Sequence, residues 1–450
     1  MKRILWFRRD LRLNDNPLLA LGGEVLPIFI FDTDILAKLP KEDKRVSFIF
    51  WHVEILKKNL LACGLELKLF YGKPEDVFDL LLQKHDFDEV VACGDYDAYA
   101  KARDLKISHK LHFRYLEDTY IFKHNEVLKE NGSAYLVFTP FYKKARAILE
   151  HKNIQESFLA ESQLIDENYS GITEVQKSGE VVVLAFAMES LGFESVALNF
   201  TNPHAKLEIF KDKINNYKEQ RDYLDVDVTS NLSADLRFGT IGVREVLRFV
   251  MELKGQDIEP FIRQLLFRDF YAYLLFHMPR IESENYKYTF NGIEDEEKYA
   301  RFCEAKTGVP IVDAGVRELL QTGNMHNRVR MVVASFFTKD LLLPWQWGEK
   351  FFAQHLLDYD KASNVLSWQW SAGTGVDPQP YFRVFNPYLQ SKKFDKEGAY
   401  IKKYIIELWH VESKYLHDEN YLLKSQIQGY PQPMVSHKQA AKEAIELFRN

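Results

Sequence analysis

Three hydroxyl groups and one amide fall within the five residues Thr229–Ser233, directly before the segment Ala234–Thr240. Ser and Thr in such a position commonly cap a helix start through their side-chain oxygens. Hydroxyls and free backbone amides at a helix start can also bind phosphate. The residue types alone leave both interpretations open.

A second candidate is the segment Asn327–Met331, which carries Arg328 and Arg330. Residues at i and i+2 do not share a helix face, so one arginine can point inward and the other outward. An inward guanidinium needs a carboxylate partner, because a lone buried charge is too costly. Asp358 and Asp360 are the candidates, and an ordinary structural ion pair is the simpler alternative.

Two indoles, Trp368 and Trp370, stand next to Gly373 and Gly375, which permit close approach of the backbone. At i and i+2 the two rings face different ways. One can belong to the core while the other lines a cavity and stacks on a base, which is typically worth ~1–3 kcal/mol. Two core tryptophans are the alternative.

Residues 383–403 form a basic stretch in a chain whose net charge is −6. That net charge argues against a uniformly basic nucleic-acid coat, but not against a local patch. The stretch is either a solvated surface or a rim that contacts phosphates. Its basic residues are Arg383, Lys392, Lys393, Lys396, Lys402 and Lys403, and its acids are Asp395 and Glu397.

The first 130 residues alternate between apolar runs and segments of helical period. Such alternation predicts a doubly wound parallel sheet with helices on both faces, and ligands at the carboxyl ends of its strands. There is no G-x-G-x-x-G or P-loop, so a conventional dinucleotide or NTP site is not supported. The predicted strands are Ile4–Phe7, Val25–Phe31, Leu65–Phe70 and Glu89–Cys93, the helices Lys44–Cys63 and Val77–Leu82, and the strand ends Arg8–Asp10, Asp32–Asp34 and Gly94–Asp97.

The second half is predicted to be all-α. We therefore expect an α/β domain over residues 1–130, a connector over 131–195 and a helical domain over 196–450. The expected helices are Val243–Leu253, Glu259–His277, Asp313–Thr322, Asn327–Leu342, Trp347–Asp358 and the amphipathic Lys438–Phe448.

Composition narrows the class of protein. With 46% hydrophobic and 28% charged residues, the 450-residue chain is globular and not disordered. No apolar run approaches the roughly 18 residues of a membrane span. Three scattered cysteines are too few for a disulfide framework or a zinc site. We expect a cytoplasmic protein without a metal site or a membrane partner.

Taken in order, these segments resemble the DNA photolyase/cryptochrome family, and most of all its class I cyclobutane pyrimidine dimer photolyases. The resemblance covers nearly the whole chain. It lies in Trp6–Asn16, Val137–Phe141, Thr229–Ser233 with Leu236–Gly239, Arg268–Tyr271, Lys306–Ala314, Met325–Met331, Trp368–Gly375, Tyr381–Pro387 and Tyr430–Pro433.

The resemblance implies an N-terminal domain for an antenna pigment and a helical domain that holds FAD. Asn364 would lie near flavin N5, and Arg330 paired with Asp358 would place fixed charge beside the ring system. By matching positions, the residues around FAD would be Tyr217, Thr229, Ser230, Asn231, Leu232, Ser233, Phe261, Arg268, Asn327, Arg330, Asp358, Asp360 and Asn364.

The implied activity is light-dependent repair of UV-damaged DNA. Photoexcited reduced FAD would donate an electron to a flipped-out cyclobutane pyrimidine dimer and split it to the monomer bases. Catalytic roles would fall to Asn364, Trp370 and Gln264. The lesion pocket would hold Gln264, Phe267, Asn327, Met331 and Trp370, and Arg221, Arg328, Arg383 and Gln390 would contact the DNA backbone.

Two departures keep other functions open. Dimer photolyases usually carry Glu where this chain has Gln264 and Trp where it has Phe267. Gln cannot supply a proton, and it also occurs in (6-4) photolyases, so (6-4) repair is an alternative. His326-Asn327 in place of paired histidines, and Met331, favour the cyclobutane dimer. A cryptochrome-type photoreceptor is the other alternative, which the lack of an extended tail disfavours.

Photoreduction and the antenna also depart from the family pattern. Trp368 and Trp345 match the first two members of the tryptophan triad, but the third is Phe302, a poor electron donor. Tyr299 or Trp347 would have to replace it. The positions that match the folate-binding pair are Tyr99 and Ala100, which lack the expected amide and carboxylate. Asp95–Tyr99 fits a flavin- or deazaflavin-type antenna better, and an empty site is a third option. We expect a monomer, because a lesion cleft needs an open face.

Overall fold

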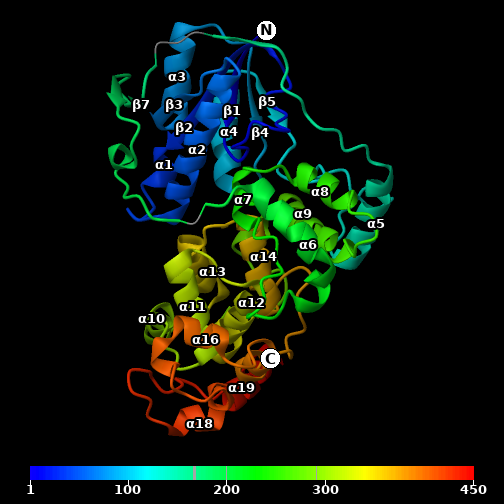
Figure 1. Cartoon of the computed structure of the whole chain (residues 1–450), viewed down its shortest axis with the longest axis vertical. Helices are drawn as coiled ribbons and strands as arrows, with labels where there is room; N and C mark the ends of the chain where they lie inside the picture. Colours follow the sequence, from blue (N-terminus) through cyan, green and yellow to red (C-terminus); the bar gives the residue numbers. More distant parts are fainter. Residues whose placement is uncertain (166–168, 199, 290, 450) are drawn as a thin grey trace. The chain divides into compact units, whose positions relative to one another are not determined.

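The structure is a computed structural model that describes residues 1–165, 169–198, 200–289 and 291–449 (Figure 1). The chain divides into two compact units. Unit 1 comprises Met1–Val127, Lys143–Lys211 and Ser230–Asp269, and unit 2 comprises Leu128–Tyr142, Asp212–Thr229 and Phe270–Asn450. The division falls within three helices, α5 (Phe138–His151), α6 (Pro203–Gln220) and α9 (Glu259–His277).

Unit 1 is built on a mainly parallel sheet of eight strands among the described residues. The strand order is β5-β4-β1-β2-β3-β7-β8, and β6 pairs in parallel with β2. The one antiparallel pair among them is β7–β8. The strands are β1 (Lys2–Phe7), β2 (Gly23–Asp32), β3 (Lys68–Gly72), β4 (Glu89–Cys93), β5 (Phe113–Leu116), β6 (Ser162–Leu164), β7 (Ile172–Val175) and β8 (Val181–Leu184).

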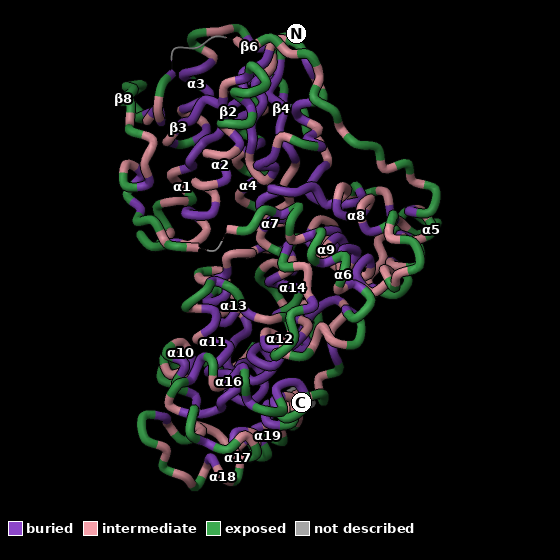
Figure 2. Tube along the Cα trace, viewed as in Figure 1, coloured by how far each residue is buried: buried purple, intermediate pink, exposed green. Residues whose placement is uncertain are grey.

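Helices cover both faces of this sheet, so its central strands are buried on both sides (Figure 2). Ile28 and Ile30 of β2 belong to the core cluster that includes Phe78 of α3 (Pro74–Lys84). Phe31, on the opposite face of β2, packs against Phe50 of α2 (Lys44–Ala62) with ring centroids 6.0 Å apart. Burial on both faces explains why β2 reads as a continuous apolar run instead of an alternating one.

The predicted doubly wound parallel sheet is confirmed, but several of its shorter strands and helices were not predicted. The four predicted strands are present as β1 to β4, and the two predicted helices as α2 and α3. The sequence patterns did not reveal α1 (Thr33–Leu36), α4 (Ala98–Ser108) or the strands β5 to β8. These strands are only three or four residues long, which is short for a pattern of period two, and β8 is an apolar run, Val181–Leu184, whose side chains are largely exposed.

The N-terminal motif Trp6–Asn16 has a structural task within unit 1. The Arg12 guanidinium donates to Asp118, to the carbonyls of Asn14 and Asp15, and to that of Gly239. Gly239 has a φ of +65°, and a Cβ there would lie 2.0 Å from the Arg9 carbonyl oxygen. The motif thus holds the start of the chain against α7 (Ser233–Phe238), which precedes α8 (Val243–Met251).

Unit 2 is helical, as predicted. The expected helix Asn327–Leu342 is α12 followed by a π-helical turn, and the expected Trp347–Asp358 begins earlier and ends earlier as α13. The helices are α10 (Glu296–Cys303), α11 (Pro310–Thr322), α12 (Asn327–Ser335), the π-turn η3 (Phe336–Asp340), α13 (Trp345–His355), α14 (Lys361–Ala372), α15 (Pro387–Phe394), α16 (Ala399–Tyr404), α17 (Ser413–Leu416), α18 (Glu419–Lys424) and α19 (His437–Arg449). Short 3₁₀ turns are η1 (Met188–Leu191, in unit 1), η2 (Pro279–Glu282) and η4 (Ile406–Leu408).

Two separate sequence motifs meet at one buried carboxylate in unit 2. Asp313, at the start of α11, accepts hydrogen bonds from the backbone and hydroxyl of Thr307, from the backbone of Gly308 and from the Tyr430 hydroxyl at 2.6 Å. Burial raises the pKa of Asp313, and these donors oppose that shift. The Lys306–Ala314 and Tyr430–Pro433 motifs therefore serve the packing of the helices.

The predicted domain boundaries near 130 and 195 stay a prediction. Of the expected connector 131–195, residues 166–168 lie outside the described residues, and the remainder includes α5, β6, β7 and β8. At the sheet edge, Val181, Val182 and Val183 of β8 are exposed. No helix in the described part of the chain is long and apolar enough to cross a membrane.

Candidate functional site

The predicted site residues are divided between the two units. In unit 1, one stripe of α9 carries Phe261, Gln264 and Arg268, since residues three and four apart share a helix face. Arg268 is held in place: it donates to the carbonyls of Thr119 and Leu236, and its guanidinium lies 4.6 Å from the centre of the Tyr120 ring. This stripe presents an aromatic, an amide and a fixed cation side by side.

Phe267 lies three residues after Gln264 and is therefore on the same side of α9. Both side chains are half-buried. The guanidinium of Arg263 lies 5.8 Å from the centre of the Phe267 ring. The two positions that depart from the family pattern thus form one pair on the helix surface.

The hydroxyl-rich segment does not place a Ser or Thr at the N-cap position of α7. The N-cap of α7 is Leu232, which makes no side-chain capping bond, and Asn231 has a left-handed φ of +54°. The capping interpretation of Thr229–Ser233 thus loses its simplest form, a Ser or Thr at the N-cap itself. Phosphate binding by this segment stays a prediction.

In unit 2, the predicted pairing of Arg330 with Asp358 is found, but Arg330 is not the more buried of the two arginines: its side chain is 26% exposed, against 17% for Arg328. Arg330 of α12 donates to Asp358 at 3.0 Å, and also to the carbonyl of Met325 and the side chain of Asn324. The second carboxylate oxygen of Asp358, Oδ1, is buried and has no hydrogen-bond partner in the described part of the chain. A buried acceptor left this way can accept a hydrogen bond from a bound group or from an ordered water.

Asn364 is oriented by a residue that sequence analysis missed. Its side-chain nitrogen donates to the backbone oxygen and the carboxylate of Glu349, both at 3.0 Å. The amide oxygen therefore points away from Glu349 and remains an acceptor. Asp360 caps α14 by accepting from the backbone of Ser363. No spacing rule could have singled out Glu349, because it lies on another helix, α13.

The predicted lesion residues of unit 2 lie at helix surfaces. Asn327 is exposed, and its amide lies 3.8 Å from the sulfur of Met331, one turn later on α12. Trp370 is half-buried, with the Phe385 ring 6.3 Å away, whereas Trp368 is buried. The two indoles thus face different environments, as their spacing predicts.

The predicted DNA-backbone residues differ in how free they are. Arg383 is exposed. Arg221 lies over the Tyr217 ring at 5.5 Å. Gln390 is half-buried and its Oε1 has no partner among the described residues. Arg328 is engaged with Asp222 at 2.5 Å, a partner that the sequence analysis missed.

Trp368 packs inside unit 2 among aromatic rings. Its neighbours are Phe337 at 5.4 Å and Phe352 at 4.9 Å, and its ring lies against the backbone of α13 at Gly348. Trp345, also on α13, donates its ring N–H to Asn285 at 2.7 Å.

Phe302, at the third triad position, is fully buried and packs on Phe337 and Phe351. It offers neither a donor ring nor an outlet to solvent. Tyr299 and Trp347 are both half-buried and their rings lie 5.1 Å apart. The two residues predicted to replace Phe302 are therefore in contact with each other.

The carboxyl ends of the strands in unit 1 form a polar cluster, as predicted. Arg9 is paired with Asp95 at 2.8 Å, and the Tyr99 hydroxyl donates to Asp32 at 2.6 Å. Asp97 accepts from the backbone of Ala100 and so caps α4. Burial raises the pKa of Asp32, while the Tyr99 hydrogen bond opposes that shift.

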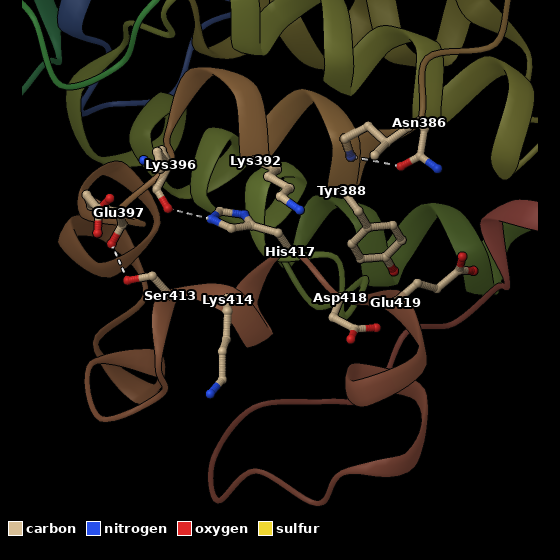
Figure 3. Close-up of a pocket in the computed structure, with 11 residues that line it drawn as sticks. Asn386, Tyr388, Lys392, Lys396, Glu397, Ser413, Lys414, His417, Asp418 and Glu419 are labelled. Carbon is tan, nitrogen blue, oxygen red and sulfur yellow. Dashed lines mark hydrogen bonds between the residues drawn. The ribbon is translucent and has the colours of Figure 1, made fainter.

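Two surface hollows are not lined by the predicted site residues. One, of about 350 Å³, lies in unit 1 and includes Trp51, His52 and His204 in its lining. The other, of about 490 Å³, lies in unit 2 beside α15 (Figure 3). Lys392 of α15 faces Asp418 and Glu419 across it, so the walls carry charges of both signs.

The chain is similar to known proteins in both sequence and structure. A family model described as DNA photolyase matches residues 3–158, and one described as the FAD binding domain of DNA photolyase matches residues 261–450. A deoxyribodipyrimidine photo-lyase from Alkalihalophilus pseudofirmus is 33% identical over 476 residues, covering 99% of this chain and 98% of that protein.

Two solved structures are similar over the full chain. A bacterial class III photolyase from Agrobacterium tumefaciens has a TM-score of 0.85 and 31% identity, covering 100% of this chain and 97% of that one. An archaeal photolyase from Sulfolobus tokodaii, solved with two FAD molecules, has a TM-score of 0.83 and 30% identity, covering 100% of both chains.

Proposed function

This chain belongs to the DNA photolyase family, and from that membership we propose that it is a light-dependent DNA repair enzyme that splits cyclobutane pyrimidine dimers. The family's FAD-binding domain is present in residues 261–450, and FAD is the cofactor. The observation that carries the proposal is the Arg330–Asp358 pair within that domain, because its second carboxylate oxygen is buried, has no partner among the described residues and can accept from a bound group.

The residues present fit FAD. The unpaired Oδ1 of Asp358 and the free amide oxygen of Asn364 are acceptors suited to the N–H groups of a flavin ring. The residues proposed to hold the cofactor are Tyr217, Thr229, Ser230, Asn231, Leu232, Ser233, Phe261, Arg268, Asn327, Arg330, Asp358, Asp360 and Asn364. FAD, reduced and excited by light, would supply one electron to the lesion and take it back after the ring has opened.

The chain's own residues orient the groups that would face the cofactor and would bind the lesion. Arg330 holds the Asp358 carboxylate in one orientation, while Glu349 fixes the Asn364 amide so that its oxygen stays an acceptor. We propose that Trp370, Phe267 and Met331 give the flipped dimer apolar contacts. Flipping is cheaper for a lesion that already pairs and stacks badly.

Gln264 is proposed to hydrogen-bond the dimer bases without changing protonation. An amide both donates and accepts but has no titratable proton, so binding through Gln264 should not depend on pH between about 5 and 8. The same residue is the observation that favours the second candidate, repair of the (6-4) photoproduct. The lesion itself therefore has to be the variable in the experiment.

The test follows lesion loss in the reduced, FAD-loaded protein. Oligonucleotides with one thymine dimer or one (6-4) photoproduct are illuminated near 380 nm or kept dark. We expect light-dependent loss of the dimer alone, unchanged dark samples, and activity lost in Trp370→Ala but retained in Trp409→Ala, a matched change at an exposed tryptophan. Loss of the (6-4) lesion alone, or of neither, would overturn the proposal and point to the second candidate or to a photoreceptor.

We also propose that the electrons for photoreduction enter the protein through Trp347 and Tyr299 instead of through Phe302. The support is the 5.1 Å contact between these two half-buried rings, together with the burial of Phe302. Electrons would pass from them toward Trp345 and Trp368. Trp347→Phe and Tyr299→Phe should each slow photoreduction by at least tenfold in transient absorption, with Tyr415→Phe as the control. Unchanged rates in both variants would exclude this exit.

For the antenna, we propose a flavin- or deazaflavin-type chromophore at the strand ends of unit 1. The similar photolyase from Sulfolobus tokodaii holds two FAD molecules, which supports a second flavin in this fold. Here Arg9, Asp95 and Asp97 supply polar groups of the kind a flavin edge needs, whereas Tyr99 and Ala100 lack a folate-type amide and carboxylate. Extracted chromophores should contain a second flavin-type species per chain; folate, or FAD alone at one per chain, would refute this.

The proposed partner is UV-damaged DNA, bound by a monomer in the cytoplasm. Its backbone contacts are proposed to include Arg221, Arg383 and Gln390. Size-exclusion chromatography with light scattering should give a mass near 52.8 kDa, the mass of one chain.

A further inference from the structure

Ser367 has an exposed side chain in the middle of α14, between two buried neighbours. Leu366 and Trp368 are 3% and 1% exposed, and the helix continues for several residues on either side. An exposed residue within such a buried stretch lies on the side of the helix that packing leaves uncovered. Ser367 therefore marks the open side of α14.

The open side of α14 also carries two of the proposed site residues. Ser367 follows Asn364 by three residues and precedes Trp370 by three, and residues three apart project from the same side of a helix. Asn364 is proposed to face the cofactor and Trp370 to face the lesion. The Ser367 hydroxyl thus lies between a cofactor contact and a lesion contact on one helix surface.

The Ser367 hydroxyl is held by Tyr271 of α9. A hydrogen bond joins the two side chains, and both residues belong to unit 2. Hydroxyls within helices often donate instead to the carbonyl four residues earlier, as Thr338 does to Ala334 at 2.7 Å. The bond to Tyr271 turns the Ser367 hydroxyl away from its own helix.

The direction of this hydrogen bond leaves a proton on Ser367 that can be donated. Burial raises the pKa of Tyr271 to about 12, so the phenol keeps its proton at neutral pH. A phenol is a stronger donor than an aliphatic alcohol, so Tyr271 donates and the Ser367 oxygen accepts. The Ser367 proton is then available on the open side of α14.

We propose that Ser367 is a further lesion-binding residue, whose hydroxyl donates a hydrogen bond to a carbonyl oxygen of the pyrimidine dimer, and that Tyr271 is its positioning residue. This rests on the proposed function, since it concerns the same site. A dimer contact is favoured over a flavin contact because Tyr271 lies one turn after Phe267 on α9, a residue proposed to contact the lesion. The carbonyl oxygens of flipped bases have lost their partners in the duplex and need new donors.

The same contact would act in the electron step. The electron that splits the dimer places negative charge on the base carbonyls before it returns to the flavin. Hydrogen bonds to a charged acceptor are about twice as strong as neutral ones. The Ser367 hydroxyl therefore contributes more after the electron has arrived than before, and it does so without giving up its proton.

Three single variants and one double variant separate the contact from its positioning. Ser367→Ala removes the donor, Ser367→Thr keeps a hydroxyl, and Tyr271→Phe removes the group that orients Ser367. The double variant Ser367→Ala/Tyr271→Phe tests whether both residues act through one contact. The matched control is Ser425→Ala, at an exposed serine of unit 2 outside the proposed site.

The experiment measures binding of the FAD-loaded protein in the dark to duplexes with and without a thymine dimer, and repair near 380 nm. We expect Ser367→Ala to lower the preference for the dimer about three- to tenfold, the effect of one neutral hydrogen bond, and to lower the repair yield, with binding of undamaged duplex unchanged. Tyr271→Phe should lose about two- to fivefold, and the double variant no more than Ser367→Ala. Ser367→Thr and the control should stay within about twofold of the wild type.

The opposite results are distinguishable from one another. Equal preference for the dimer in the wild type and Ser367→Ala would exclude the contact and leave the proposed function intact. Weaker retention of FAD in Ser367→Ala, with dimer preference unchanged, would assign the hydroxyl to a flavin carbonyl and overturn the proposal. Losses that add in the double variant would show that Tyr271 does not act through Ser367. A wild type without preference for the dimer would refute the proposed function and this contact together.

Discussion

Gly348 shows how the absence of one side chain makes room for the buried indole ring of Trp368. A Cβ at Gly348 would lie 2.2 Å from the Trp368 ring, far inside van der Waals contact. Ala is favoured over Gly in a helix by about 1 kcal/mol. Overpacking of this kind usually costs about 1–3 kcal/mol, and here the whole indole would have to move. The cost of overpacking is therefore expected to exceed the gain in helix propensity.

Gly348→Ala is expected to lower the free energy of unfolding by about 1–2 kcal/mol and to slow photoreduction, since Trp368 is displaced. Urea denaturation and transient absorption measure the two effects. Gly94→Ala is the control, because its Cβ would meet nothing closer than 3.8 Å. A Gly348→Ala protein as stable as the wild type would show that the indole does not depend on this gap.

Lys339 gives the stability curve a predictable pH dependence. Burial lowers its pKa from 10.5 to about 7. Between pH 7 and 10.5 the unfolded chain therefore binds more protons than the folded one, and stability rises with pH over that window. Below pH 7 the folded protein must bury the charge.

Lys339→Met should accordingly be more stable than the wild type at about pH 6 by a few kcal/mol, an advantage that shrinks toward about pH 10. Urea denaturation at several pH values across this range would measure it, with the exposed Lys58→Met as the control. If stability changed equally with pH in Lys339→Met and in the wild type, the lowered pKa of Lys339 would be contradicted.

At the scale of elements, Asp313 is the point where the start of α11 and the segment around Tyr430 are joined. Tyr430→Phe removes one of its hydrogen bonds but leaves the donors from Thr307 and Gly308. We expect a loss of about 1–2 kcal/mol, measured by thermal and urea unfolding. Tyr415→Phe, at a half-buried stacked ring, should change little. Equal losses of stability in both variants would show that the hydrogen bond from Tyr430 to Asp313 has no special role in joining these two segments.

Periodicity and apolar runs predicted the buried elements well and the exposed ones poorly. The strands β1 to β4 and the helix α9 were found because burial leaves an unbroken apolar run or a period of about 3.6 residues. β5 and β8 are four-residue strands, too short for a period to be read, and the apolar run of β8 is largely exposed. The Arg330–Asp358 pair was predictable because a buried arginine needs a carboxylate. Asp222 and Glu349 were not, because no charge rule called for a partner of the neutral Asn364, and the rule of one inward arginine left Arg328 without one.

At the scale of the whole molecule, an acidic protein is proposed to bind a polyanion through a few local cations. With Arg221 and Arg383 as phosphate contacts, the salt slope for DNA binding should be at least as steep as about −1.8. Lys392 and Lys396 line the hollow beside α15 and have no ion pair among the described residues.

If these lysines belong to the DNA-contacting rim, Lys392→Gln/Lys396→Gln should make the slope less steep by up to about 1.8. Fluorescence anisotropy between 50 and 200 mM salt would measure it, with Lys58→Gln/Lys442→Gln, two exposed lysines outside the basic stretch, as the control. An unchanged slope would assign Lys392 and Lys396 to solvated surface.

The edge strand β8 has a practical consequence for work with the protein at high concentration. Val181, Val182 and Val183 present exposed apolar side chains on a strand whose outer backbone groups have no neighbouring strand in the described sheet. Such an edge is a template for pairing with another chain. Slow precipitation in concentrated stocks should therefore begin at this edge, and a single charged residue in place of Val182 would extend their storage life.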